Sequence, residues 1–397
     1  RLMTFFGSAK YSDTIERTPD ALAKLERLRK TFAHEEADRV PISDFFWGSF
    51  TRRWREELGL ADDADPYRHY DLDFIVTVPN MDPHIRQFET VKEDDEEVVI
   101  KTGFETTIRK RFDLPMPEQV SWETDTIEKL EAFEFDDPWD RHRYFEAGDN
   151  QIAGVGDGFE RNSPPWVETV RGLHADFPVY GSITEASEIT TRLLGQLNTL
   201  TWIGEYPERF GEQLLRIGEF SYEVAKAQIE AADGLLDGMV IWGDAAYKKG
   251  LFMGPTYWRK YYKPTIARII EQSHSHGQPV MFHGCGNANS YHEDMNEIGL
   301  DGYNPLDAKA DLDVNDLRER LGHHLTFMGN SDIRVWEKGD PDEVRREVLH
   351  RLRAARDGGY IFASDHSVSS DVSGQTYDLI VKTVREFGDY PLELPEE

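Results

Sequence analysis

Eight short apolar runs, most of them followed by an amphipathic helical pattern, constrain the fold of this 397-residue chain. A regular alternation of strands and helices builds α/β folds around a parallel sheet. Eight strands, each followed by a helix, close a (β/α)8 TIM barrel, although the alternation alone also permits an open, doubly wound sheet. We expect the strands at residues 40–45, 74–78, 178–182, 238–242, 279–283, 302–305, 325–329 and 360–363.

Two of the expected helices carry clear start signals. Thr18 and Pro19 predict the first turn of a helix, which places a helical extension at residues 1–39, before the barrel. Asp340 stands at the cap position before a second helix, and Gly358 is expected to terminate it.

The interval between the second and third expected strands is too long for a simple strand–helix connection. Residues 86–112 have the alternation of a β-hairpin with Gly103 at its turn, and residues 114–166 are rich in proline and glycine. We therefore predict an insertion of about residues 86–170 on the rim of one barrel domain that spans residues 1–397.

The composition excludes several classes of function. Asp and Glu number 75 against 45 Lys and Arg, a formal charge of −30, which disfavours binding to nucleic acid. No run of about 18 apolar residues is present, so we expect no membrane span. A single cysteine cannot form an internal disulfide and suits a reducing, cytoplasmic location.

Polar or aromatic side chains follow nearly every expected strand. In a barrel of this kind the loops after the strands converge on one mouth, where the chemistry takes place. The pattern therefore indicates a functional site built from the strand ends. The residues at these positions are Trp47, Asn80, Thr184, Glu185, Asp244, His283, Cys285, Asn304, Asp307, Asn330, Asp365 and His366.

The fifth strand ends in a His-x-Cys pattern. His283 and Cys285 are two positions apart, so both side chains point to the same face of the strand. Imidazole and thiolate are zinc ligands, and His366, after the eighth strand, could supply a third and Asp307 a fourth. A buried thiol beside a hydrogen-bonded histidine, with Asp307 stabilising a turn, explains the same residues without a metal.

Two acidic residues are candidates for catalysis. Glu185 and Asp244 could orient a substrate or hold a proton, and they could equally begin a helix and cap a loop. Aromatic residues near the mouth could line an apolar pocket or simply pack. The predicted substrate contacts are Trp47, Asn80, Trp242, Tyr247, Tyr303, Asn330 and Asp365.

Four segments together resemble the uroporphyrinogen decarboxylase superfamily, whose barrel also serves corrinoid-dependent methyltransferases. They are residues 28–41, 243–253, 281–287 and 358–362. The resemblance covers nearly the whole chain, from about Leu25 to Phe387. It implies a (β/α)8 barrel and, as in many members of this superfamily, a homodimer.

Two departures from the family pattern separate its branches. True uroporphyrinogen decarboxylases carry an arginine-rich motif after the first strand, and this chain has residues 44–50 there, with arginines only at Arg52 and Arg53. Without early guanidinium groups a polycarboxylated tetrapyrrole has little to hold it. The zinc methyltransferases use His-x-Cys and a second cysteine after the last strand, and His366 stands in place of that cysteine.

The resemblance therefore implies a zinc-dependent methyltransferase or demethylase that moves a methyl group between a small methylated substrate and a corrinoid (cobalamin). No Asp-x-His-x-x-Gly run for binding cobalamin is apparent, so we expect a partner corrinoid protein to supply it. One alternative is a metal-independent decarboxylase or lyase for a small carboxylate, with Asp244 and His366 in acid–base roles. The other is a corrinoid-binding protein without catalytic activity.

Overall fold

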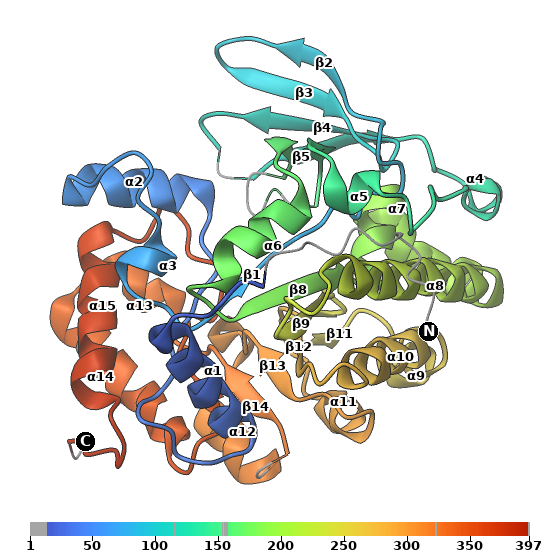
Figure 1. Cartoon of the computed structure of the whole chain (residues 1–397). Coiled ribbons are helices and arrows are strands. Elements are labelled where there is room, and N and C mark those ends of the chain that lie inside the picture. Colours follow the sequence, from blue (N-terminus) through green and yellow to red (C-terminus); the bar gives the residue numbers. More distant parts are fainter. Residues whose placement is uncertain (1–13, 115, 153, 155–157, 322–323, 396–397) are drawn as a thin grey trace.

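A seven-stranded parallel sheet forms the centre of the molecule (Figure 1). The computed structural model describes residues 14–395, apart from 115, 153, 155–157 and 322–323. The sheet curls, and its strands follow one another in the order of the chain. They are β1 (Ile75–Val76), β8 (Val179–Thr184), β9 (Gly238–Trp242), β12 (Val280–His283), β13 (Gly302–Asn304), β14 (Thr326–Met328) and β15 (Tyr360–Ile361).

The expected strand at residues 40–45 does not form a regular strand. Ile42 makes an isolated parallel bridge with Phe362, beyond β15, and its carbonyl oxygen accepts a hydrogen bond of 2.9 Å from Asp73 N, before β1. The segment thus lies between the first and last strands of the curled sheet. Pro41 has no N–H to donate, so a continuous ladder cannot form there.

Helix α1 (Pro19–Phe32) lies at the amino ends of the central strands. Its predicted cap is confirmed, because Thr18 Oγ1 accepts a 3.2 Å hydrogen bond from Ala21 N. Leu28 joins the apolar cluster inside the curled sheet, and Phe32 packs against it. Burying these side chains closes the interior of the sheet at this end.

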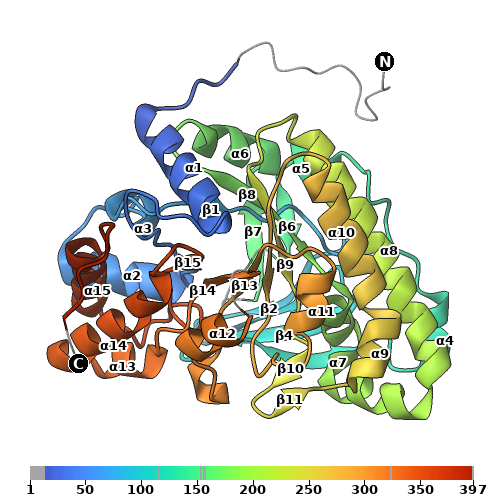
Figure 2. The ribbon, with the colours of Figure 1, turned by 90° about the horizontal axis from the view of Figure 1, so that it is seen from below.

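The longer helices cover the outside of the sheet. Figure 2 shows α13, α14 and α15 on one side and α8, α9 and α10 on the opposite side. The helices are α2 (Gly48–Leu58), α3 (Pro66–His69), α4 (Ile127–Ala132), α5 (His142–Phe145), α6 (Trp166–His174), α7 (Ala186–Glu205), α8 (Pro207–Ala231), α9 (Pro255–Tyr261), α10 (Lys263–His274), α11 (His292–Glu297), α12 (Val314–Leu321), α13 (Ile333–Lys338), α14 (Pro341–Leu352) and α15 (Gly374–Phe387), with 3-10 turns η1 (Ala308–Ala310) and η2 (Arg353–Ala355). Within the described ranges, no helix is both long and apolar enough to cross a membrane.

The end of α14 corrects one expectation. The helix begins as predicted, with the Asp340 carboxylate accepting hydrogen bonds from the backbone of Asp342 and Glu343. It ends at Leu352, short of Gly358, and the chain continues as η2. Gly358 instead occupies a turn with φ +74° next to the backbone of Glu35, where a Cβ would clash.

Between β1 and β8 the chain forms a separate four-stranded antiparallel sheet. Its strands, in spatial order, are β2 (Glu89–Glu93), β3 (Glu97–Lys101), β4 (Thr106–Arg111) and β5 (Glu118–Trp122). The short pairs β6 (Gly148–Asn150) with β7 (Glu160–Ser163) and β10 (Ala246–Tyr247) with β11 (Gly250–Leu251) complete the strands. Figure 1 shows the four-stranded sheet above α7. Side chains from β4 and β5 hydrogen bond to the backbone of α7, so this sheet is fixed next to the carboxyl end of β8.

Candidate active site

A cavity of about 200 Å³ lies at the carboxyl ends of the central strands. Its walls come from the ends of β8, β9 and β12, from the loop after β15, and from Met116 and Ile152 of the region between β1 and β8. Loops converge at this end of a parallel α/β sheet, which makes the cavity the candidate active site. It is smaller than the ~300–1,000 Å³ that most drug-sized ligands need, so the geometry favours a small substrate.

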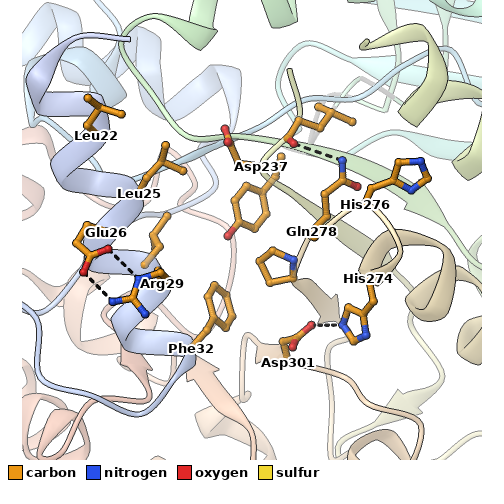
Figure 3. A pocket seen from close by; sticks show the side chains of 15 residues that line it. Leu22, Leu25, Glu26, Arg29, Phe32, Asp237, His274, His276, Gln278 and Asp301 are labelled. Carbon is orange, nitrogen blue, oxygen red and sulfur yellow. Dashed lines mark hydrogen bonds and ion pairs between the residues drawn. The ribbon is translucent and has the colours of Figure 1, made fainter. Parts of the chain in front are cut away.

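A larger groove of about 780 Å³ lies at the opposite, amino end of the strands. Figure 3 shows Leu22 and Leu25 of α1 on one side and His274 and Gln278 on the other. The charged side chains on its walls are paired, as in the His274–Asp301 contact of 2.7 Å. Active sites of such barrels lie at the carboxyl ends of the strands, so this groove is not the candidate active site.

His283 is held in one orientation at the end of β12. Its Nδ1 lies 2.5 Å from Asn304 Oδ1, while Asn304 Nδ2 donates to Met328 O at 3.0 Å and thereby fixes the amide. The histidine therefore donates from Nδ1 and keeps the lone pair on Nε2. Burial lowers the pKa of His283 to about 4, so the ring is neutral at neutral pH.

Cys285 lies beside this lone pair, with Sγ 3.8 Å from His283 Nε2. The Cys285 N–H donates to Asp244 Oδ1 at 2.9 Å, which ties the loop after β12 to the loop after β9. Burial, together with the negative charge of Asp244, raises the pKa of the thiol well above its usual value. Without a neighbouring cation the sulfur stays protonated and is a poor nucleophile.

His366 lines the same cavity from the loop after β15. Its Nδ1 lies 2.9 Å from Ser367 O, so this nitrogen donates and Nε2 keeps its lone pair. The Trp47 ring contacts the imidazole edge-on, at 5.9 Å between centroids. The structure thus brings His283, Cys285 and His366 to one cavity. Two imidazole Nε2 atoms and one sulfur are available there as electron-pair donors.

Three polar residues line the cavity near the end of β8 and the start of α7, and the sequence analysis predicted one of them. Thr184, the last residue of β8, was singled out, and Glu188 and Arg192 were missed. Glu188 Oε2 accepts a 3.3 Å hydrogen bond from Arg192 Nε. The spacing of four residues puts these groups on one helix face, and that spacing was the available signal.

Glu185, which was predicted to act in catalysis, does not line the cavity. It is 3% exposed, and its carboxylate accepts a hydrogen bond from Ser187 Oγ. Burial raises the pKa of Glu185 to about 7. Glu188, nearly one turn further along α7, presents a carboxylate to the cavity instead.

Asp307 and Asp365 support loops through backbone hydrogen bonds. Asp307 accepts from Lys309 N at 2.9 Å and caps η1. Asp365 accepts from Ala308 N at 3.0 Å and from Ile333 N at 2.9 Å. Neither residue lines the cavity, so Asp307 as a fourth ligand and Asp365 as a substrate contact stay predictions.

Four other predicted substrate contacts also lie outside the cavity lining, while Trp242 and Trp47 line it. The side chain of Asn330 bridges the backbone at Val314, Leu306 and Leu312, and that of Asn80 accepts from Asp82 N. Tyr303 donates from its buried hydroxyl to Gly284 O at 3.0 Å, and Tyr247 is 47% exposed, stacked on Phe252. Their contacts stabilise the surrounding loops.

Comparison with known proteins bears on the family. A family model described as Uroporphyrinogen decarboxylase (URO-D) matches residues 156–387, more than half of the chain. The chain belongs to the uroporphyrinogen decarboxylase family. This confirms the resemblance to the family, and three of the four segments that indicated it, residues 243–253, 281–287 and 358–362, lie within the matched range.

Relatives of this uroporphyrinogen decarboxylase family member are distant. A uroporphyrinogen decarboxylase from Shewanella halifaxensis is 22% identical over 383 residues, which cover 94% of this chain and 93% of that protein. One from Synechocystis sp. is 26% identical over 107 residues, which are 27% of this chain and only 29% of that protein. A solved structure described as a methyltransferase from Methanosarcina mazei shares the fold, with a TM-score of 0.61, 16% identity, and coverage of 91% of this chain and 98% of that one.

Proposed function

We propose that this chain is an enzyme that transfers a methyl group between a small substrate and a corrinoid carried by a partner protein. The proposal takes the chain as one (β/α)8 barrel domain, with residues 40–46 closing the ring and about residues 86–170 inserted at the rim. The observation that carries it is the cavity in which His283, Cys285 and His366 present two lone pairs and one sulfur.

Two of these side chains fit neighbouring positions around a zinc ion. Zinc–nitrogen and zinc–sulfur bonds of ~2.0 and ~2.3 Å at a tetrahedral angle separate the two donor atoms by about 3.5 Å. His283 Nε2 and Cys285 Sγ are 3.8 Å apart. In the described part of the chain, no three His, Cys, Asp or Glu side chains stand close enough together to hold a metal ion. The spacing of His283 and Cys285 suits two zinc ligands, and His366 is the proposed third ligand, which would have to approach this pair when zinc binds.

Bound zinc would supply a Lewis acid that favours the deprotonated form of a substrate thiol or hydroxyl. The chain's own residues do the rest. Asn304 keeps His283 in the tautomer that offers Nε2, and Asp244 holds the Cys285 backbone in place. Trp47 and Trp242 form apolar walls that exclude water from the reacting groups.

Porphyrin decarboxylation is disfavoured by the placement of the arginines. Arg53 is engaged by Glu57 and by Ser370 O, and with Arg52 it lines a different groove, outside the cavity. Arg192 is the arginine on the described cavity wall, and it contacts Glu188. A cavity of about 200 Å³ with one arginine offers little to a large polycarboxylate.

The test uses zinc-loaded protein with chemically reduced cobalamin and candidate methyl ethers, thioethers and alcohols. We expect the absorbance of cob(I)alamin to decay into that of methylcobalamin, and Cys285→Ser to abolish the change. Transfer that persists after the zinc is removed by a chelator would show that the reaction does not need the metal. No transfer from any donor by zinc-loaded protein would overturn the proposal.

A further inference from the structure

Arg192 presents unused hydrogen-bond donors to the cavity. Its Nε donates to Glu188 Oε2, and Nη1 and Nη2 have no acceptor among the residues that the structure describes. The side chain is 27% exposed, so most of its surface is covered by neighbouring residues. A guanidinium fork of this kind matches a carboxylate, sulfonate or phosphate with two parallel hydrogen bonds.

The backbone of Arg192 is held from outside its own helix. Gly195, with φ +76°, interrupts α7 just after this residue. The Arg192 carbonyl oxygen accepts hydrogen bonds from Thr106 Oγ1 at 2.7 Å and Gln119 Nε2 at 3.3 Å. A Cβ at position 195 would lie 2.6 Å from the Trp122 ring, so glycine is required at the interruption. The antiparallel sheet therefore holds the backbone of Arg192 in place, and the contact with Glu188 orients its guanidinium.

Thr184 supplies a second group without a partner. Its side chain is 2% exposed and lines the same cavity, and Oγ1 has no hydrogen-bond partner in the described structure. Buried hydroxyls are nearly always paired, so an orphan on a cavity wall points to a ligand that completes it. Thr184, Glu188 and Arg192 all line the cavity.

We infer that the substrate of the proposed methyl transfer carries an oxyanion group, which the Arg192 fork and the Thr184 hydroxyl bind. The inference rests on the proposed function and names the substrate class of the same cavity. The two carboxylates on the wall already accept hydrogen bonds. Glu188 accepts from Arg192 Nε, and Asp244 accepts from the backbone N–H of Cys285. Beside them, the Nη atoms of Arg192 and the hydroxyl of Thr184 are unpaired and can donate, and a ligand that complements them supplies acceptors.

The test is binding of small anions to the full-length, folded protein, measured by calorimetry. The probes are methoxyacetate, methanesulfonate and inorganic phosphate, which separate the three sources of an oxyanion, with 2-methoxyethanol as the neutral comparison. We expect saturable binding of at least one anion and none of the alcohol. Arg192→Gln and Thr184→Val should each raise its Kd at least tenfold. Arg209→Gln, at an exposed arginine paired with Glu131, should leave the Kd unchanged.

Two results would overturn the inference. The first is that wild-type protein binds none of the three anions. The second is that Arg192→Gln and Thr184→Val bind the anion with the wild-type Kd, as the control Arg209→Gln does. Thr184→Val is nearly isosteric, so it keeps the test valid if Arg192→Gln fails to fold. Methyl transfer without anion binding would remove only the inference, whereas anion binding without methyl transfer would support it and remove the proposed function.

Discussion

Replacing Asp44 with asparagine should change how the stability of the protein depends on pH. Asp44 is 1% exposed beneath the loop that carries His366. Its Oδ1 accepts from Ser364 N at 2.9 Å and from Ser364 Oγ at 2.8 Å, and its Oδ2 accepts from Tyr377 OH at 2.9 Å. Burial outweighs these hydrogen bonds and raises the pKa of Asp44 from 3.8 to about 7.

The sign and size of the effect follow from this pKa. A raised folded-state pKa means that the contribution of Asp44 to stability is present below its unfolded pKa, near 4, and is lost as the pH rises through about 7. A difference of roughly 3 pKa units at ~1.36 kcal/mol each gives about 4 kcal/mol. Asparagine does not titrate, so Asp44→Asn should gain about that much unfolding free energy, relative to wild type, between pH 4 and pH 8.

The assay is urea unfolding, followed by tryptophan fluorescence, at a series of pH values. Asp125→Asn serves as the control, because Asp125 is exposed and forms a surface ion pair with Lys129. The reasoning would be refuted if the stability difference between Asp44→Asn and wild type were the same at pH 4 and pH 8.

Two further substitutions test the packing around the strands. Asp73 is fully buried, and its Oδ1 lies 2.5 Å from Arg27 Nη1. Asp73→Ala leaves Arg27 without this partner and should lower the unfolding free energy by about 3–5 kcal/mol. A loss below ~1 kcal/mol in urea unfolding would contradict this. Gly243→Ala would place a Cβ 2.6 Å from Glu185 Cγ. It should lower the unfolding free energy by about 1–3 kcal/mol and reduce methyl transfer. Gly254→Ala, with open space around it, should be neutral in both thermal unfolding and activity.

The strand pattern could be predicted because buried parallel strands are short apolar runs bounded by turn residues. Gly238–Trp242 matches its expected range, and the other strands of the central sheet lie within or overlap theirs. The prediction of a strand at residues 40–45 was wrong, because Pro41 has no N–H to donate to a ladder of hydrogen bonds. The apolar pattern alone does not take this into account. Gly358 failed as a helix terminator because the chain turns earlier, into η2.

The site was predicted where side chains stand at strand ends and missed where they stand inside a helix. Asp244, His283 and Cys285 were found because they lie at or just after the ends of β9 and β12. Arg192 was missed because its spacing from Glu188 indicates a shared helix face, and only the tertiary structure shows that this face of α7 lines the cavity. Asp365 was assigned to the substrate, although its carboxylate lies against two backbone N–H groups that no local pattern reveals.

The metal content of the protein, measured by plasma mass spectrometry after purification from zinc-containing medium, tests the proposed site most directly. We expect about one zinc per chain in wild type, loss of the metal in Cys285→Ser and in His366→Ala, and retention in His276→Ala, an exposed histidine at the opposite end of the strands. Metal-free wild-type protein, or full zinc occupancy in Cys285→Ser, would contradict the account.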